Sequence, residues 1–143
     1  MGQFRDLPSR QGYCQVKILI DTCTFVWLVG VSYRVPVRVR EAIVDPRNEL
    51  YLSSISAWEI ARKYAIGKMD LQGRPEDLVA EFRGRMGVES LPLKEIEAIT
   101  AEKLPPYHRD PFDRMMIAQA ILHGMVIATP DEAFARYPVQ LLW

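Results

Sequence analysis

The stretch Val16-Lys17-Ile18-Leu19-Ile20-Asp21 decides the fold. Three consecutive aliphatic residues followed by an acid predict a short central strand that is buried on both faces and ends in a carboxylate. In an open sheet of parallel strands the carboxyl ends of the strands open into one crevice, where residues distant in the sequence meet. We therefore expect Asp21 to lie in such a crevice.

Short strands and helices alternate along the rest of the chain. Strands are predicted at 50–52, 88–91, 125–128 and 139–142, and helices after Asp21 and at 37–44, 55–66, 75–86, 92–104 and 111–123. In the helix at 55–66 the apolar positions 57, 58, 60, 61, 64 and 65 form one stripe, opposite Glu59. The alternation predicts a three-layer α/β/α domain with a mostly parallel sheet.

The chain length of 143 residues is typical of a single domain. Residues 1–15 show no periodicity and are predicted to be a flexible extension, so the domain is expected at 16–143. No apolar run approaches the roughly 20 residues of a membrane span, and the N-terminus has no apolar signal segment. We expect a cytoplasmic protein in which Cys14 and Cys23 are reduced thiols.

Three more carboxylates stand near the start of a predicted helix: Glu59, Asp113 and Asp131. Asp21 and Asp131 could each be a helix N-cap instead of a ligand. Glu59 follows Ser56 by three residues and precedes Lys63 by four, so a capping box or a helical salt bridge could explain it.

Asp113 is harder to explain as a cap. Asp110-Pro111 already supplies an N-cap and a proline at the first helical position. Asp113 begins the stripe that continues with Met116, Ile117 and Ala120, and a charge on a buried stripe needs a partner.

Together the four acids predict an oxygen-only site that favours Mg²⁺ or Mn²⁺ over Zn²⁺. The hydroxyl of Thr129 could orient a carboxylate or a metal-bound water. His108, on a loop ahead of Asp113, could touch a substrate, whereas His123 in the last turn of a helix is interpreted as structural. Eighteen basic and eighteen acidic residues cancel, but a bound metal that neutralised the four acids would leave a modest basic surplus.

These segments resemble PIN-domain proteins, specifically the VapC-type toxins of bacterial toxin-antitoxin pairs. The resemblance rests, in order, on Ile20-Asp21-Thr22, on residues 53–60 (SSISAWEI), on residues 104–114 (LPPYHRDPFDR) and on Ala128-Thr129-Pro130-Asp131. Cys23 stands where many relatives have His, and Pro130 is an unusual neighbour for the fourth acid. The soft thiol of Cys23 could make the enzyme sensitive to oxidation.

The resemblance implies a Mg²⁺- or Mn²⁺-dependent endoribonuclease with a cognate antitoxin and a second copy of the chain as partners. By position, Asp21, Glu59, Asp113 and Asp131 match the four acids of the family. Thr22 and Thr129 would support them through their hydroxyls. Asp21 and Asp113 are the expected direct ligands. The basic residues expected to contact RNA phosphates are Arg62, Lys63, Arg109 and Arg114.

Two other functions stay open. A non-catalytic PIN-like module that binds RNA or a protein would use its carboxylates only as caps. A metal-dependent phosphatase is the third hypothesis, although Asp21-Thr22-Cys23 lacks the Asp-x-Asp of the haloacid dehalogenase type.

Overall fold

The computed structural model describes residues 15–143 and contains one parallel five-stranded sheet. The strands lie in the order β3-β2-β1-β4-β5, and every neighbouring pair is parallel. Their bounds are β1 (Lys17–Ile20), β2 (Glu49–Ser53), β3 (Val88–Leu91), β4 (Val126–Ala128) and β5 (Gln140–Leu142). The expected sheet is confirmed, and the predicted extension at 1–15 lies, except for residue 15, outside the described residues.

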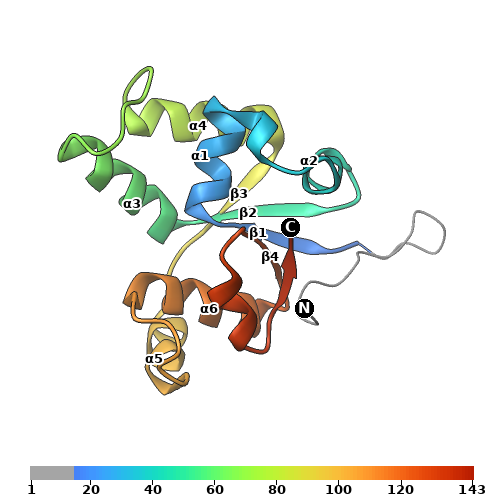
Figure 1. Cartoon of the computed structure of the whole chain (residues 1–143), viewed down its shortest axis with the longest axis vertical. Helices are drawn as coiled ribbons and strands as arrows, with labels where there is room; N and C mark the ends of the chain where they lie inside the picture. The colour runs from blue at the N-terminus through green and yellow to red at the C-terminus, as the bar shows by residue number, and fades with distance from the viewer. Residues whose placement is uncertain (1–14) are drawn as a thin grey trace.

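Helices cover both faces of the sheet (Figure 1). One face carries α1 (Thr22–Gly30), α2 (Val37–Val44), α3 (Ser54–Ala65) and α4 (Pro75–Met86), and the other carries α5 (Glu95–Lys103) and α6 (Pro111–His123). Two short 3-10 helices, η1 (Ser32–Arg34) and η2 (Glu132–Arg136), complete the described chain. The three-layer α/β/α architecture is confirmed. No helix within residues 15–143 is long and apolar enough to cross a bilayer.

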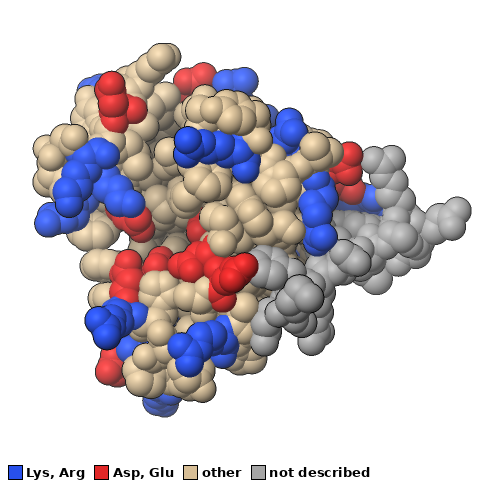
Figure 2. Space-filling model, viewed as in Figure 1, with Lys and Arg blue, Asp and Glu red and all other residues tan. Residues whose placement is uncertain are grey.

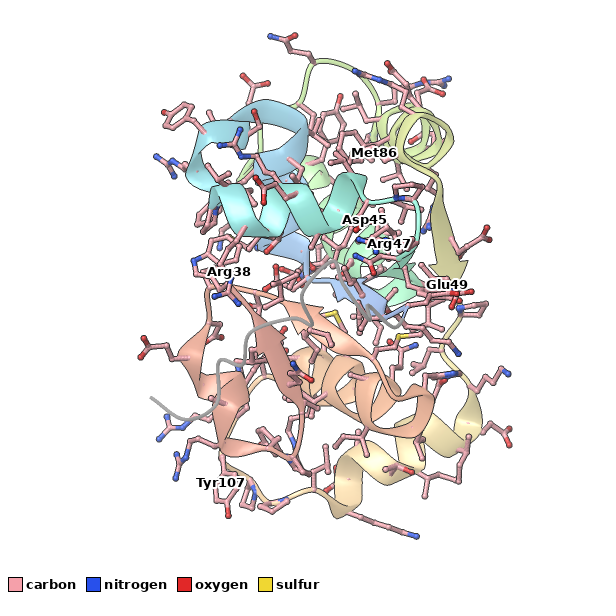
Figure 3. All side chains as sticks on the ribbon, turned by 90° about the vertical axis from the view of Figure 1, so that its right-hand side faces the viewer. Arg38, Asp45, Arg47, Glu49, Met86 and Tyr107 are labelled. Atoms are coloured by element: carbon pink, nitrogen blue, oxygen red, sulfur yellow. The ribbon has the colours of Figure 1, made fainter. Side chains whose placement is uncertain are left out.

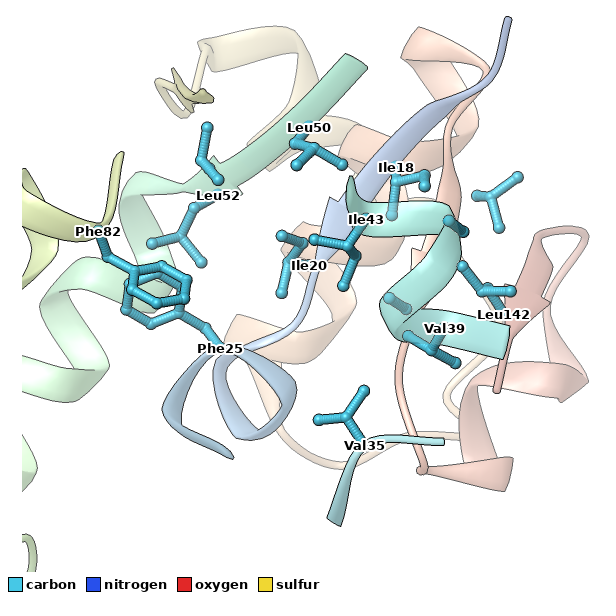
Figure 4. Close-up of a cluster of buried hydrophobic side chains, with 14 of the residues drawn as sticks. Ile18, Ile20, Phe25, Val35, Val39, Ile43, Leu50, Leu52, Phe82 and Leu142 are labelled. Carbon is cyan, nitrogen blue, oxygen red and sulfur yellow. The ribbon is translucent and has the colours of Figure 1, made fainter. Parts of the chain in front are cut away.

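Strand β1 anchors two separate hydrophobic clusters because its side chains alternate between the two faces of the sheet. Ile18 and Ile20 pack on the α1–α4 side, where Phe25 and Phe82 meet edge to face at 4.9 Å (Figure 4). Leu19 packs on the other side, in the cluster that includes Met116 and Ile117 of α6. The three aliphatic residues of β1 are fully buried, as the apolar run predicted.

The order of the strands places a crevice at the carboxyl end of β1. From β1 the chain moves outward on one side to β2 and β3, and β4 and β5 lie on the other side of β1. The direction of winding therefore reverses between β1 and β4, which is where open α/β sheets bind ligands. At the opposite end of the sheet, Asp45 and Arg47 form an ion pair ahead of β2 (Figure 3).

Two details of the helices differ from the sequence-based expectation. In α3 only Ile60 of the expected apolar stripe is buried, because the second half of the helix extends past the edge of the sheet (Figure 1). Trp58 and Tyr64 of that stripe are 46% and 40% exposed. Helix α5 begins at Glu95 instead of Pro92, since Lys94 is its N-cap and the Lys94 N–H donates to Glu97 Oε2 at 2.6 Å.

Candidate metal centre

The four acids selected from the sequence line a single pocket of about 310 Å³ at the carboxyl ends of β1 and β4. The other lining residues are Thr22, Cys23, Pro130 and Phe134. Figure 2 shows acidic side chains gathered in a hollow between the two helical layers, with Lys and Arg side chains around it. The fold thus brings carboxylates from four segments of the chain to one place.

Asp21 uses its two carboxylate oxygens differently. Oδ1 accepts the Thr24 N–H at 2.8 Å and caps α1, so the capping interpretation is confirmed. Oδ2 accepts the Thr129 hydroxyl at 2.5 Å. Burial raises the pKa of Asp21 above its usual value, although the hydrogen bonds from Thr129 and Thr24 oppose the shift. Capping and a role in the pocket are therefore compatible in one side chain.

Asp131 repeats this arrangement after β4. Its Oδ1 accepts the Ala133 N–H at 2.9 Å and caps η2, while Oδ2 lies 3.3 Å from His108 Nε2. The Asp131 N–H donates to Thr129 Oγ1 at 3.1 Å. Thr129 is fully buried and contacts Asp21 and Asp131 through one hydroxyl, so it links the two strand ends.

Asp113 stands in the first turn of α6 and has no capping role. Asp110 is the N-cap, since its Oδ1 accepts the Phe112 N–H at 2.9 Å, as predicted. Asp113 Oδ2 lies 3.2 Å from His108 Nε2. Burial, followed by repulsion from Asp110, raises the pKa of Asp113 to about 7, and His108 opposes the shift.

Glu59 lies in the second turn of α3. The capping-box explanation is wrong, because the helix begins at Ser54 and the cap is Ser53, whose hydroxyl accepts the Ile55 N–H at 3.1 Å. The salt-bridge explanation is confirmed, since Lys63 Nζ is 2.9 Å from Glu59 Oε2. Glu59 Oε1 lies 3.2 Å from the Thr22 hydroxyl and points to the same pocket.

The donor set of this pocket fits a hard divalent cation. Carboxylate oxygens are the ligands that Mg²⁺ and Mn²⁺ prefer, and they crowd here in a partly buried space. The raised pKa values of Asp21 and Asp113 mean that negative charge is destabilised in the metal-free protein. A bound cation would remove that cost.

Comparisons with known proteins agree with this fold. The family model of the PIN domain matches residues 18–140. This chain belongs to the PIN-domain family. A search of curated protein sequences finds no match.

Solved structures with the same fold include VapBC2, FitAcB and VapBC-1 from three bacteria. VapBC2 from Rickettsia felis, bound to a promoter DNA fragment, has a TM-score of 0.68 at 16% identity, covering 88% of this chain and 97% of that one. FitAcB from Neisseria gonorrhoeae has a TM-score of 0.63 at 22% identity, and VapBC-1 from nontypeable Haemophilus influenzae 0.62 at 18%. Each of these two matches covers 88% of this chain and 96% of the other chain.

The four basic residues predicted to contact phosphate lie outside the lining of the pocket. Lys63 is paired with Glu59. Arg114 Nη2 donates to the carbonyl oxygens of Ala101 and Leu104 at 2.9 and 2.8 Å, which accounts for its guanidinium without a substrate. Arg62 and Arg109 are exposed, and the Arg62 guanidinium lies 5.8 Å from the centre of the Trp58 ring.

Sequence reasoning missed two contributors to this PIN-domain site. Ser56 is fully buried, and its hydroxyl accepts from Thr22 Oγ1 at 2.9 Å, which joins α1 to α3 beside Glu59. His108 was assigned to a loop that could touch substrate, yet its Nε2 lies between Asp113 and Asp131. The sequence did offer one sign of the contact between His108 and these acids, because His108 lies two residues ahead of the Asp110 cap.

Proposed function

We propose that this PIN domain is a Mg²⁺- or Mn²⁺-dependent endoribonuclease and the toxin component of a VapBC-type pair, acting in the cytoplasm. The observation that carries the proposal is the convergence of Asp21, Glu59, Asp113 and Asp131 on one pocket at the reversal between β1 and β4. The family match and the likeness to toxin-antitoxin assemblies support the same conclusion.

Asp21 and Asp113 would be the direct ligands of the cation. A divalent metal held by these acids would lower the pKa of a water and stabilise the charge that develops on the phosphate. Thr129 orients Asp21 through the 2.5 Å hydrogen bond to Oδ2. Asp21 and Thr129 are buried, which limits their motion and keeps the donor geometry fixed.

Glu59 and Asp131 would complete the site, directly or through water. Their side chains are 23% and 44% exposed, so solvent reaches them more easily than it reaches Asp21. A proton released by the attacking water would pass to a carboxylate oxygen of one of these two acids. The Lys63 ammonium, 2.9 Å from Glu59 Oε2, holds this carboxylate in place on α3.

RNA would approach along the rim of the pocket. Arg62 and Arg109 are exposed and are the phosphate contacts that we retain from the predicted set. Lys63 would act indirectly, by holding the Glu59 carboxylate. Arg114 would act indirectly too, by fixing the connection between α5 and α6 through its bonds to the Ala101 and Leu104 carbonyl oxygens.

Two surfaces with accessible apolar side chains suit the protein partners. A groove of about 650 Å³ is lined by α1, α4 and the loop before α4, including Val29, Leu71 and Leu78, and suits an amphipathic segment of an antitoxin. On α5, Ile96 and Ile99 are 57% and 53% exposed and lie one turn apart, which suits contact with a second copy. We place the antitoxin in the groove and the homodimer contact on α5.

The test is RNA cleavage by protein made by cell-free synthesis, so that toxicity does not prevent its production. A mixed RNA pool is incubated with Mg²⁺ or Mn²⁺, with EDTA, and with the Asp21→Asn variant. We expect cleavage only by the wild type with metal. Asp77→Asn is the matched control, because Asp77 is exposed in the first turn of α4 and lies outside the pocket lining. Cleavage that persists in EDTA or in Asp21→Asn would contradict the metal mechanism, and no cleavage of any RNA would favour a binding module.

A further inference from the structure

His108 is held rigidly on the loop between α5 and α6. Its side chain is 14% exposed, and its ring meets Phe134 edge to face at 5.4 Å. The backbone N–H of His108 donates to Tyr137 Oη at 2.9 Å, and the Tyr137 hydroxyl donates to the Pro105 carbonyl oxygen at 2.7 Å. The neighbouring Tyr107 is exposed and points outward (Figure 3), so the loop turns only the histidine toward the acids.

The contacts of the ring determine which nitrogen carries the hydrogen. The backbone N–H of Asp110 lies 3.2 Å from His108 Nδ1 and can only donate, so Nδ1 must be an acceptor. The hydrogen of the neutral ring is then on Nε2. Nε2 lies 3.2 Å from Asp113 Oδ2 and 3.3 Å from Asp131 Oδ2. The Nε2–H hydrogen bond goes to Asp131, and the Asp113 carboxylate contacts the same nitrogen from a different element.

This arrangement argues against His108 as a metal ligand, although its ring nitrogen and oxygens of Asp113 and Asp131 all lie within 4.8 Å of one another. Coordination through Nε2 needs the lone pair of that atom, so the hydrogen would have to move to Nδ1. There it would face the Asp110 N–H, and two donors would oppose each other. Hard cations also prefer oxygen to imidazole nitrogen.

We propose that His108 is a positioning residue whose Nε2, hydrogen-bonded to Asp131 and 3.2 Å from Asp113 Oδ2, sets the separation of these two carboxylates at the metal centre. This inference rests on the proposed metal-dependent function. Without His108, the two acids sit on α6 and on the β4–η2 junction, and their mutual repulsion drives them apart. With it, Oδ2 of each carboxylate is held in place before a cation binds.

The test measures Mn²⁺ affinity directly, by electron paramagnetic resonance and calorimetry, in the wild type and in variants at position 108. His108→Phe keeps a ring against Phe134 but removes both nitrogens, and we expect Mn²⁺ affinity to fall by roughly 10-fold or more, as for other partners of metal ligands. His108→Gln keeps a donor and should recover part of the loss. His123→Phe is the matched control and should leave the affinity unchanged, because His123 bonds to Glu97 instead.

Two further measurements separate the alternatives. Nitrogen NMR of the metal-free protein should show a protonated Nε2 and an unprotonated Nδ1 at His108, and the opposite tautomer would overturn the proposal. A hyperfine coupling between bound Mn²⁺ and a histidine nitrogen would also overturn it, because His108 would then be a ligand.

An unchanged Mn²⁺ affinity in folded His108→Phe would overturn the positioning role even if RNA is cleaved, as would a wild type that binds no Mn²⁺. Conversely, His108-dependent Mn²⁺ binding without RNA cleavage would support the positioning role and contradict the proposed function.

Discussion

Two histidine–carboxylate clusters lie at the two ends of helix α6, and they differ in how completely the acid is satisfied. At the carboxyl end Glu97 is 1% exposed and accepts from the Lys94 N–H, from Gln119 Nε2 and from His123, whose Nε2 is 2.6 Å away. Burial alone would raise the pKa of Glu97, but these hydrogen bonds outweigh it and lower the pKa.

At the other end of α6 the balance is reversed. Asp113 Oδ2 lies 3.2 Å from His108 Nε2, but the hydrogen bond of that nitrogen goes to Asp131. The pKa of Asp113 rises to about 7, mainly through burial. A histidine beside a buried acid therefore does not by itself mark a functional site. The number of donors per carboxylate separates a structural acid from one that leaves room for a cation.

The largest effect on stability is expected when Glu97 is removed. Glu97→Ala leaves Gln119 without one of its partners, deprives His123 of its carboxylate and opens a space between α5 and α6. We expect the free energy of unfolding to fall by about 3 kcal/mol, as is usual when one partner of a buried polar network is lost. Urea denaturation at pH 7 measures the change.

Glu95→Ala is the matched control, because Glu95 lies on the same helix and is exposed. It should change the free energy of unfolding by less than about 0.5 kcal/mol. If Glu97→Ala were as mild as the control, the network around Glu97 would contribute little and the contrast between the two ends of α6 would not hold.

An opposite and smaller effect is expected at Asp113. Its pKa is near 3.8 in the unfolded chain and about 7 in the folded protein, so the folded state binds more protons between these values. The contribution of Asp113 to the stability of the metal-free wild type should therefore be fully present below about pH 4 and be lost as pH rises through 7. Asp113→Asn carries no charge and should be more stable than the wild type by about 2 kcal/mol at pH 8, with the gap closing toward pH 5.

Thermal unfolding in EDTA between pH 5 and 8 measures this difference. Glu97 does not interfere, since its pKa lies below the usual 4.5 and its contribution is lost only at lower pH. Saturating Mn²⁺ should stabilise the wild type and not Asp113→Asn. A variant less stable than the metal-free wild type at pH 8 would mean that the Asp113 carboxylate is already satisfied by the protein.

The pocket could be predicted largely from the sequence because its acids stand where elements meet. Asp21 follows Ile18-Leu19-Ile20. Because β1 and β4 pair in parallel, their carboxyl ends lie side by side, and this does not depend on the other side chains. Asp113 was identified by its position on the buried stripe of α6, where Met116 and Ile117 are almost fully buried. These signals are local, and the topology combines them.

The Glu97 cluster could not be predicted in this way. In α5 the apolar Ile96 and Ile99 are exposed while Glu97 is buried, the reverse of what hydrophobic patterning predicts. Glu97 is buried because His123, 26 positions away, and Gln119 meet it there. Such pairing depends on how α5 packs against α6, which no local pattern encodes. The same reason explains why the tie from His108 to Asp131 was missed.

The smallest effect is expected at Cys23, which lines the acidic pocket but adds no charge to it. Burial and the nearby Asp21 carboxylate raise the pKa of the thiol, so the reactive thiolate is scarce at neutral pH. Cys23→Ser should leave RNA cleavage within about twofold and stability within about 0.5 kcal/mol of the wild type. Cleavage before and after hydrogen peroxide treatment, with Cys14→Ser as the matched variant, measures this. If peroxide inactivates the wild type but not Cys23→Ser, the thiol is part of the working site. The carboxylates alone would then not account for the chemistry of the acidic pocket.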